Sequence, residues 1–170
     1  NLTKVIAWTL PTNGGEALTI VLAVLFGLTL PVTPIQILWI NMITAVALGL
    51  TLAFEPTEAR AMCRPPRPAG RQLLSRQLWW RILFVSALMV AGTFGIYTWA
   101  MARELPIEVA RTMAVNTLVV MEIFYLFSVR YVHGTSLTWR GVLGTRPVLI
   151  GVTAVVLAQF AFTFLPPMQA

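Results

Sequence analysis

The sequence predicts an all-α integral membrane protein, a bundle of about five transmembrane helices. Only 11% of its 170 residues are charged and 58% are hydrophobic, whereas soluble domains have about 25% charged residues. The hydrophobic residues gather in long blocks instead of the narrow stripes of amphipathic helices. The loops between the blocks alternate between basic and neutral, as they do in proteins that cross a membrane several times.

Five blocks predict five membrane spans, because the last four are each close to the ~20 residues that cross a bilayer core and the first is longer. They cover residues 5–30, 34–54, 79–101, 112–131 and 148–165 of one membrane domain, 1–170. The early part of the first block is mixed in polarity, so we expect that helix to begin in water. It lacks the basic start and the small-residue cleavage site of a signal peptide.

Prolines and tryptophans mark the limits of these helices. Pro31 and Pro34 enclose a short turn after the first block, which makes the first two helices antiparallel neighbours. Trp79 opens the third block and fits the aromatic belt of a membrane interface. Opposite charges that cancel separate the third block from the fourth, and Pro166 closes the fifth.

Basic residues orient the bundle. The segment 55–81, which contains a basic loop at 55–78, has six arginines and two glutamates, and 130–146 has three arginines and no acid. The positive-inside rule places both segments and the N-terminus in the cytoplasm. The net charge of +6 is therefore explained by topology and by contact with membrane lipid, and no nucleic acid partner is expected.

Polar residues inside the predicted spans indicate a function, because inserting an ionisable side chain into the membrane core costs about 2.5–3.5 kcal/mol of free energy. Glu16 lies ~18 Å along the helix from the external end of its span, near the bilayer midplane. Glu122 lies near the centre of the fourth block, and Asn41 and Thr44 lie in the second. Asn13 and Glu16 are three residues apart, as are Asn41 and Thr44, so each pair shares a helix face.

These spacings predict that Asn13, Glu16, Asn41, Thr44 and Glu122 form one cluster of oxygen atoms that suits a hard cation or a proton. Pro11 and the two glycines before Glu16 are expected to weaken the helix and free carbonyl groups as further ligands. A structural interpretation also stays open. Asn41 and Thr44 can form hydrogen bonds that hold two helices together, and Glu122 can be a neutral structural carboxyl.

Nothing in the chain can bind and split a nucleotide. The sequence has no aspartate, no glycine-rich phosphate loop and a single histidine, His133. Its single cysteine, Cys63, cannot form a disulfide within the chain. Energy for active transport would have to come from another part of a longer protein, from a partner or from an ion gradient.

Four motifs follow one another within the first 67 residues: N-x-G-E ending at Glu16, P-x-x-P-x-Q-x-L-W-x-N-x-x-T ending at Thr44, then FEP and RPPR. In order and separation they resemble the C-terminal membrane region of type II P-type cation ATPases, especially the calcium-pump-like branch. The similarity continues more weakly over the rest of the 170 residues.

The resemblance implies that the five spans correspond to spans five to nine of a ten-span pump. The first four spans, the tenth, and the actuator, nucleotide-binding and phosphorylation domains would lie outside this chain. ATP and Mg²⁺ would act only through those domains, which would be partners of this chain together with the missing helices. Residues 1–11 would end the stalk from the phosphorylation domain, and the plasma membrane is the expected location.

By the same resemblance Asn13 and Glu16 match cation ligands of the fifth span, Asn41 and Thr44 match ligands of the sixth, and Glu122 matches the glutamate of the eighth. Calcium pumps follow the N-x-x-T pair with an aspartate that bridges two ions, where this sequence has Ala45. Calcium prefers six to eight oxygen ligands, so a two-calcium site is not expected. One divalent ion, one monovalent ion or a countertransported proton stays open.

We therefore expect the transport-domain fragment of an ATP-driven cation pump, which moves the cation by alternating access and has no catalytic residue of its own. Two alternatives stay open from the sequence. One is a stand-alone secondary cation or proton transporter or channel that uses the same cluster. The other is a membrane subunit that does not transport.

Overall fold

A computed structural model describes residues 2–54, 76–130 and 145–164 of the chain, and all regular structure in this part is helical. The helices are α1 (Leu2–Leu25), α2 (Pro34–Ala53), α3 (Arg76–Ala102), α4 (Ile107–Arg130) and α6 (Arg146–Phe164). The all-α prediction is confirmed. Four of these helices, α2, α3, α4 and α6, are long and apolar enough to cross a membrane.

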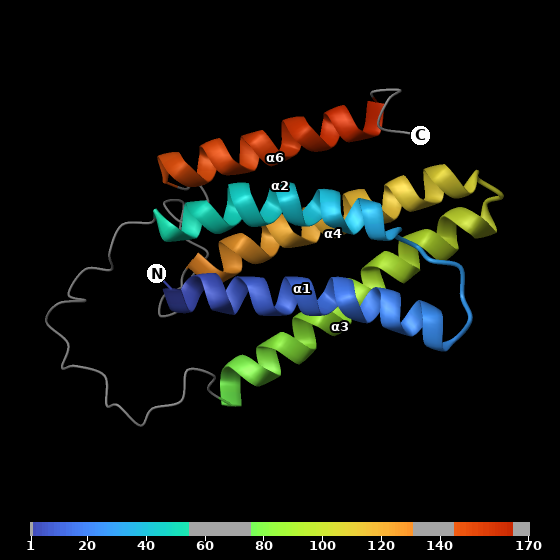
Figure 1. Ribbon diagram of the computed structural model, residues 1–170, viewed down its shortest axis with the longest axis horizontal. Coiled ribbons are helices and arrows are strands. Elements are labelled where there is room, and N and C mark those ends of the chain that lie inside the picture. The colour runs from blue at the N-terminus through green and yellow to red at the C-terminus, as the bar shows by residue number, and fades with distance from the viewer. Residues whose placement is uncertain (1, 55–75, 131–144, 165–170) are drawn as a thin grey trace, which may run out of the picture.

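Helix α4 is the centre of the bundle, because it contacts each of the other four helices. Figure 1 shows successive helices running in opposite directions, with α1 between α2 and α3 and with α6 on the outer side of α2. Helix α1, predicted as the first span, is not among these four candidate spans, and it contains the polar residues Lys4, Asn13 and Glu16. Most of the predicted basic loop, and Cys63 within it, lie outside the described residues.

The turn between α1 and α2 is fixed by caps at both of its ends. Gly27 has a positive φ of 62°, and the amide of Leu28 donates to the carbonyl of Ala23 at 2.8 Å, which is the Schellman pattern that ends many helices. Thr33 then caps α2 in a reciprocal capping box with Gln36, and Pro34 occupies the first turn. This turn places α2 beside α1 and antiparallel to it.

The pairing of α4 with α6 depends on polar side chains. Gln159 donates from Nε2 to Oδ1 of Asn116 at 2.8 Å, and Asn116 donates from Nδ2 to the hydroxyl of Thr163 at 3.2 Å. In lipid, apolar burial does not drive helices together, so such bonds and close backbone packing have to do so.

Helix α1 passes Pro11 and the glycine pair at Gly14 and Gly15 without interruption. The helix is continuous here, although Pro11 has no amide hydrogen and leaves one helix bond unmade. Contacts with α3 support this segment: the hydroxyl of Ser86 donates to the carbonyl of Pro11 at 2.9 Å, and the missing side chain of Gly15 lets Met89 approach the backbone. The packing energy between the helices outweighs the weak helix propensity of these residues.

Gly151 is the point where α6 rests on α2. A Cβ atom at this position would lie 2.9 Å from the carbonyl oxygen of Ala47 and would overlap the Thr51 methyl group. The backbone oxygen cannot move aside, so any side chain at residue 151 has to push the two helices apart.

We expect Gly151→Ala to lower the thermal stability of the detergent-solubilised protein, because overpacking costs about 1–3 kcal/mol. Gly95→Ala is the matched control: a Cβ there meets nothing within 4 Å, and alanine favours a helix over glycine by about 0.5–1 kcal/mol. Thermal unfolding of both variants measures the contrast. Equal melting temperatures for the two variants would show that α2 and α6 do not pack closely at Gly151.

Candidate cation site

Glu16 lies on the buried face of α1. Thr12, Gly15 and Thr19, which are one turn from Glu16 or next to it, are also buried, and the exposed fraction of Glu16 is 3%. These positions follow the i, i+3, i+4, i+7 spacing of a single helix face. Gly15 allows α3 to close over this face, because a Cβ there would lie 2.8 Å from both the Cβ and the sulfur of Met89.

Helix α2 brings Asn41 and Thr44 to the same face. The amide nitrogen of Asn41 donates a hydrogen bond to Oε2 of Glu16 and a second one, 3.2 Å long, to the carbonyl of Ile37. Thr44 is buried, with an exposed fraction of 2%, and its hydroxyl donates to the carbonyl of Ile40 at 3.0 Å. The bond between Asn41 and Glu16 joins α1 to α2 at the level of the acidic side chain.

Helix α4 adds the second acidic side chain, Glu122, whose exposed fraction is 1%. Its carboxyl group interacts with the side chains of Glu16 and Thr44. The structure thus brings Glu16, Asn41, Thr44 and Glu122 together from three helices. The two glutamates face each other, although like charges at close range repel.

Two oxygen atoms of this cluster have no hydrogen-bond donor. They are Oε1 of Glu16 and Oε2 of Glu122, both buried. No lysine or arginine occurs in residues 5–54, 82–102, 112–129 or 147–164, so the sequence places no basic side chain within the apolar parts of these helices. Buried acidic groups are normally paired or bound to a metal ion, and these two oxygens are available for such a ligand.

The cluster is small for a metal site made of protein atoms alone. Within the described residues, no three His, Cys, Asp or Glu side chains come together. Its oxygen donors are two carboxyl groups, one amide and one hydroxyl, which are hard ligands that suit a hard cation. Ala45, where the calcium-pump pattern has aspartate, is exposed on α2.

Asn13 is the predicted site residue that the structure does not bring into the cluster. It is exposed on α1, one turn before Glu16, and takes no part in the contacts that join the other four residues. The residues that sequence analysis missed are Trp8 and Tyr125. The indole nitrogen of Trp8 donates to the carbonyl of Glu122 at 3.3 Å, and the Tyr125 hydroxyl donates to the carbonyl of Ala7 at 2.8 Å.

Comparison with known proteins identifies related sequences over the whole chain. The profile of a family described as "Cation transporting ATPase, C-terminus" matches residues 29–170. The probable cation-transporting ATPase F of Mycobacterium tuberculosis is 51% identical over 170 residues, which are 99% of this chain and 19% of that protein.

More distant relatives also have transport names. The cation-transporting ATPase pma1 of Synechocystis is 35% identical over 176 residues, which cover 99% of this chain and 19% of that protein. The mouse calcium-transporting ATPase type 2C member 2 is 31% identical over 175 residues, with 99% and 18% covered. The chain therefore spans about a fifth of the length of these relatives.

We expect Glu16→Gln and Glu122→Gln to raise the melting temperature of the protein in a chelating, cation-free buffer. Glutamine keeps the size of glutamate and an oxygen that accepts a hydrogen bond, but it removes a buried acidic group that has one oxygen without a donor. Relief of such an unfavourable functional site typically stabilises a protein by about 0.5–2 kcal/mol. Thermal unfolding is the measurement.

Glu104→Gln is the control for this experiment, because Glu104 is exposed in the turn after α3 and its replacement should leave the melting temperature unchanged. A fall in stability for both buried variants would contradict the interpretation that the two acidic groups, each with one oxygen that has no donor, are costly to bury.

Proposed function

Because the chain belongs to the cation-transporting ATPases, as a C-terminal membrane region of that family, we propose that it is the transport part of an ATP-driven cation pump. It is a multi-pass integral membrane protein, with four helices long and apolar enough to cross a membrane. Its own residues would bind the cation, whereas ATP and Mg²⁺ would act on domains outside this chain. Those domains and further membrane helices are its proposed partners.

The observation that carries the proposal is the meeting of Glu16 and Glu122, each with a buried oxygen that has no donor. Burying a carboxyl oxygen without a hydrogen-bond donor raises the free energy of the folded protein. A purely structural role for the two glutamates would not explain why this unfavourable arrangement is present. A divalent cation between the two glutamates would neutralise both carboxylates, and a monovalent cation would neutralise one. The Thr44 hydroxyl and the Asn41 amide oxygen would complete its ligands.

The arrangement of Asn41 supports binding and release at the same site. Its amide nitrogen donates to Glu16, so a rotation of the amide group would replace that nitrogen by an oxygen that can bind a cation. Glu16 would then exchange a hydrogen-bond donor for the ion, and the reverse rotation would compensate Glu16 after release. Alternating access requires this kind of reversible exchange between two states.

Asn13 belongs to the proposal in a different way. It lies on the exposed side of α1, one turn from Glu16, where a helix from outside this chain would cover it. A polar side chain exposed to lipid is costly, so we propose that Asn13 faces the missing helices and contributes a ligand only in the complete pump.

Two further parts of the proposal come from charge. By the positive-inside rule, the arginine-rich segments favour a cytoplasmic N-terminus and a cytoplasmic loop at 55–78. The plasma membrane is the location expected from the family resemblance. With two carboxyl groups and Ala45 in place of a third, the site is proposed to hold a single hard cation.

We expect Glu16→Gln and Glu122→Gln, in the full-length protein that contains this chain, to raise the cation concentration for half-maximal ATP hydrolysis about 10- to 100-fold. Loss of a contact to a charged group costs about 1.5–3 kcal/mol, and about 1.4 kcal/mol is a tenfold change. Titrations with Ca²⁺, Mn²⁺, Na⁺ and K⁺ measure the effect and identify the ion.

Thr44→Val and Asn41→Leu should have smaller effects, about 2- to 10-fold, because they remove neutral ligands. Glu104→Gln should behave as the unmodified protein. Unchanged cation affinity and full cation-stimulated turnover in Glu16→Gln would overturn the assignment of the site.

A further inference from the structure

Pro11 leaves one carbonyl group of α1 without its helix partner. Proline has no amide hydrogen, so residue 11 cannot donate to the carbonyl of residue 7, four positions earlier. Ala7 is buried, with an exposed fraction of 5%, and water is not at hand to replace the lost bond. The hydroxyl of Tyr125 donates to this carbonyl at 2.8 Å, so a side chain of α4 replaces the bond that α1 cannot make for itself.

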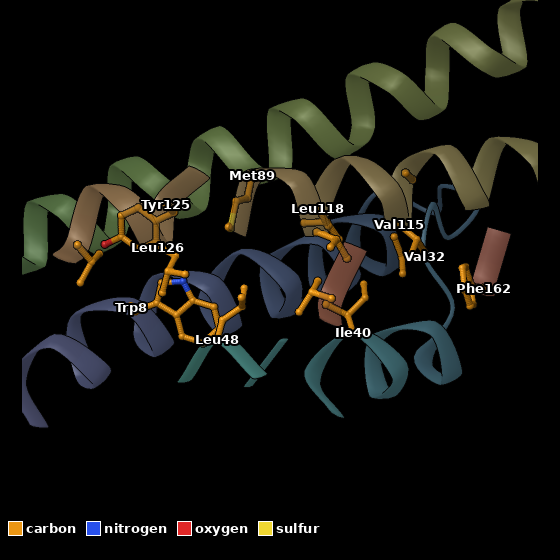
Figure 2. Packing of buried hydrophobic residues seen from close by; sticks show 14 of the residues in the cluster. Trp8, Val32, Ile40, Leu48, Met89, Val115, Leu118, Tyr125, Leu126 and Phe162 are labelled. Carbon is orange, nitrogen blue, oxygen red and sulfur yellow. The ribbon is translucent and has the colours of Figure 1, made fainter. Parts of the chain in front are cut away.

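A second bond runs in the opposite direction between the same helices. The indole nitrogen of Trp8, next to Ala7, donates to the backbone carbonyl of Glu122 at 3.3 Å. Glu122 and Tyr125 are one turn apart on α4. We call these four residues, Ala7, Trp8, Glu122 and Tyr125, the α1–α4 clasp. Figure 2 shows the Trp8 and Tyr125 side chains where α1 and α4 meet.

Helix α3 also contacts Tyr125, the tyrosine of the clasp. The guanidinium group of Arg81 lies 5.5 Å from the centre of the Tyr125 ring, within the range of a cation–π contact. Arg81 also donates to the carbonyl of Ser128 at 3.0 Å and to its hydroxyl at 3.1 Å. The Ser128 carbonyl is among the last four of α4, which have no donor within the helix.

We propose that Tyr125 is a positioning residue for the cation site: through the carbonyl that Pro11 leaves free, it fixes the register of α4 along α1 and so keeps Glu122 opposite Glu16. This inference rests on the proposed function. A shift of α4 by one turn, ~5.4 Å along its axis, would carry both bonds of the clasp beyond hydrogen-bond distance. The same shift would move the Glu122 carboxyl away from Glu16.

A substitution at Pro11 can distinguish two roles of Tyr125: positioning α4 along α1, and donating a hydrogen bond to the buried Ala7 carbonyl. In Pro11→Ala the new amide at residue 11 can donate to the Ala7 carbonyl within α1. Tyr125 is then no longer needed to satisfy that group, but it is still the side chain that ties α4 to this level of α1. Stability and cation affinity should therefore respond differently to the same pair of substitutions.

The experiment uses the full-length protein with Tyr125→Phe, Pro11→Ala and the double variant. ATP hydrolysis is measured with Ca²⁺, Mn²⁺, Na⁺ and K⁺ as probes. We expect Tyr125→Phe to raise the half-maximal cation concentration about 3- to 10-fold, to change the maximal rate less than twofold, and to lower the melting temperature. In the double variant the melting temperature should recover, whereas the cation concentration should stay raised.

Two further variants make the comparison sharper. Tyr97→Phe is the matched control: Tyr97 is also buried, and its hydroxyl shares a 2.9 Å hydrogen bond with Thr29, away from the clasp, so cation affinity should not change. Trp8→Phe removes the indole donor together with part of a buried ring. It should raise the half-maximal concentration and also lower the melting temperature, because it leaves a cavity.

Recovery of both stability and affinity in the double variant would overturn the inference and leave Tyr125 as a structural residue. Unchanged affinity in Tyr125→Phe, with Glu16→Gln shifting the affinity in the same assay, would also overturn it while the proposed function stands. If Glu16→Gln leaves the cation affinity unchanged, or if none of Ca²⁺, Mn²⁺, Na⁺ and K⁺ stimulates the unmodified protein, the proposed function fails and the positioning role fails with it.

Discussion

The burial of two acidic side chains against each other is the constraint on which the rest of this structure depends. Glu16 and Glu122 lie among apolar helices that carry no basic residue in their central parts, and two carboxylates that are both charged repel strongly in a low-dielectric surrounding. The bundle therefore has to hold α1, α2 and α4 together at this level by other means. It does so with the Asn41 bond to Glu16 and the bonds of the α1–α4 clasp.

Residues of α1 that disfavour a helix form contacts with the neighbouring helices. Pro11 removes one helix bond, and the freed carbonyl becomes an acceptor for Tyr125. Gly15 lowers helix propensity, and in return Met89 of α3 packs against the backbone next to Glu16. Residues that would destabilise an isolated helix thus create the contacts that fix it among its neighbours, as is common where membrane helices pack closely.

Sequence analysis could predict the helices and most of the candidate cluster, because both depend on local patterns. Hydrophobic blocks predict helices in lipid, and the three-residue spacing of Asn41 and Thr44 places them on one face whatever the tertiary structure. Asn13 shows the limit of that argument: spacing puts it near Glu16 along the helix, but its exposure depends on which neighbours α1 has. Trp8 and Tyr125 could not be predicted, because their bonds depend on the register of two helices more than a hundred residues apart in sequence.

The unbroken course of α1 has a mechanical consequence. Leu2 and Glu16 belong to one continuous helix that ends at Leu25, next to a turn closed by caps on both sides. If this helix tilts as one body about that end, the constant rise per residue makes Leu2 travel roughly two and a half times as far as Glu16. A large displacement of the N-terminal end of the helix would thus move the Glu16 carboxyl group by less than half as much. Such a small displacement is enough to change the distance between a carboxyl oxygen and a bound cation.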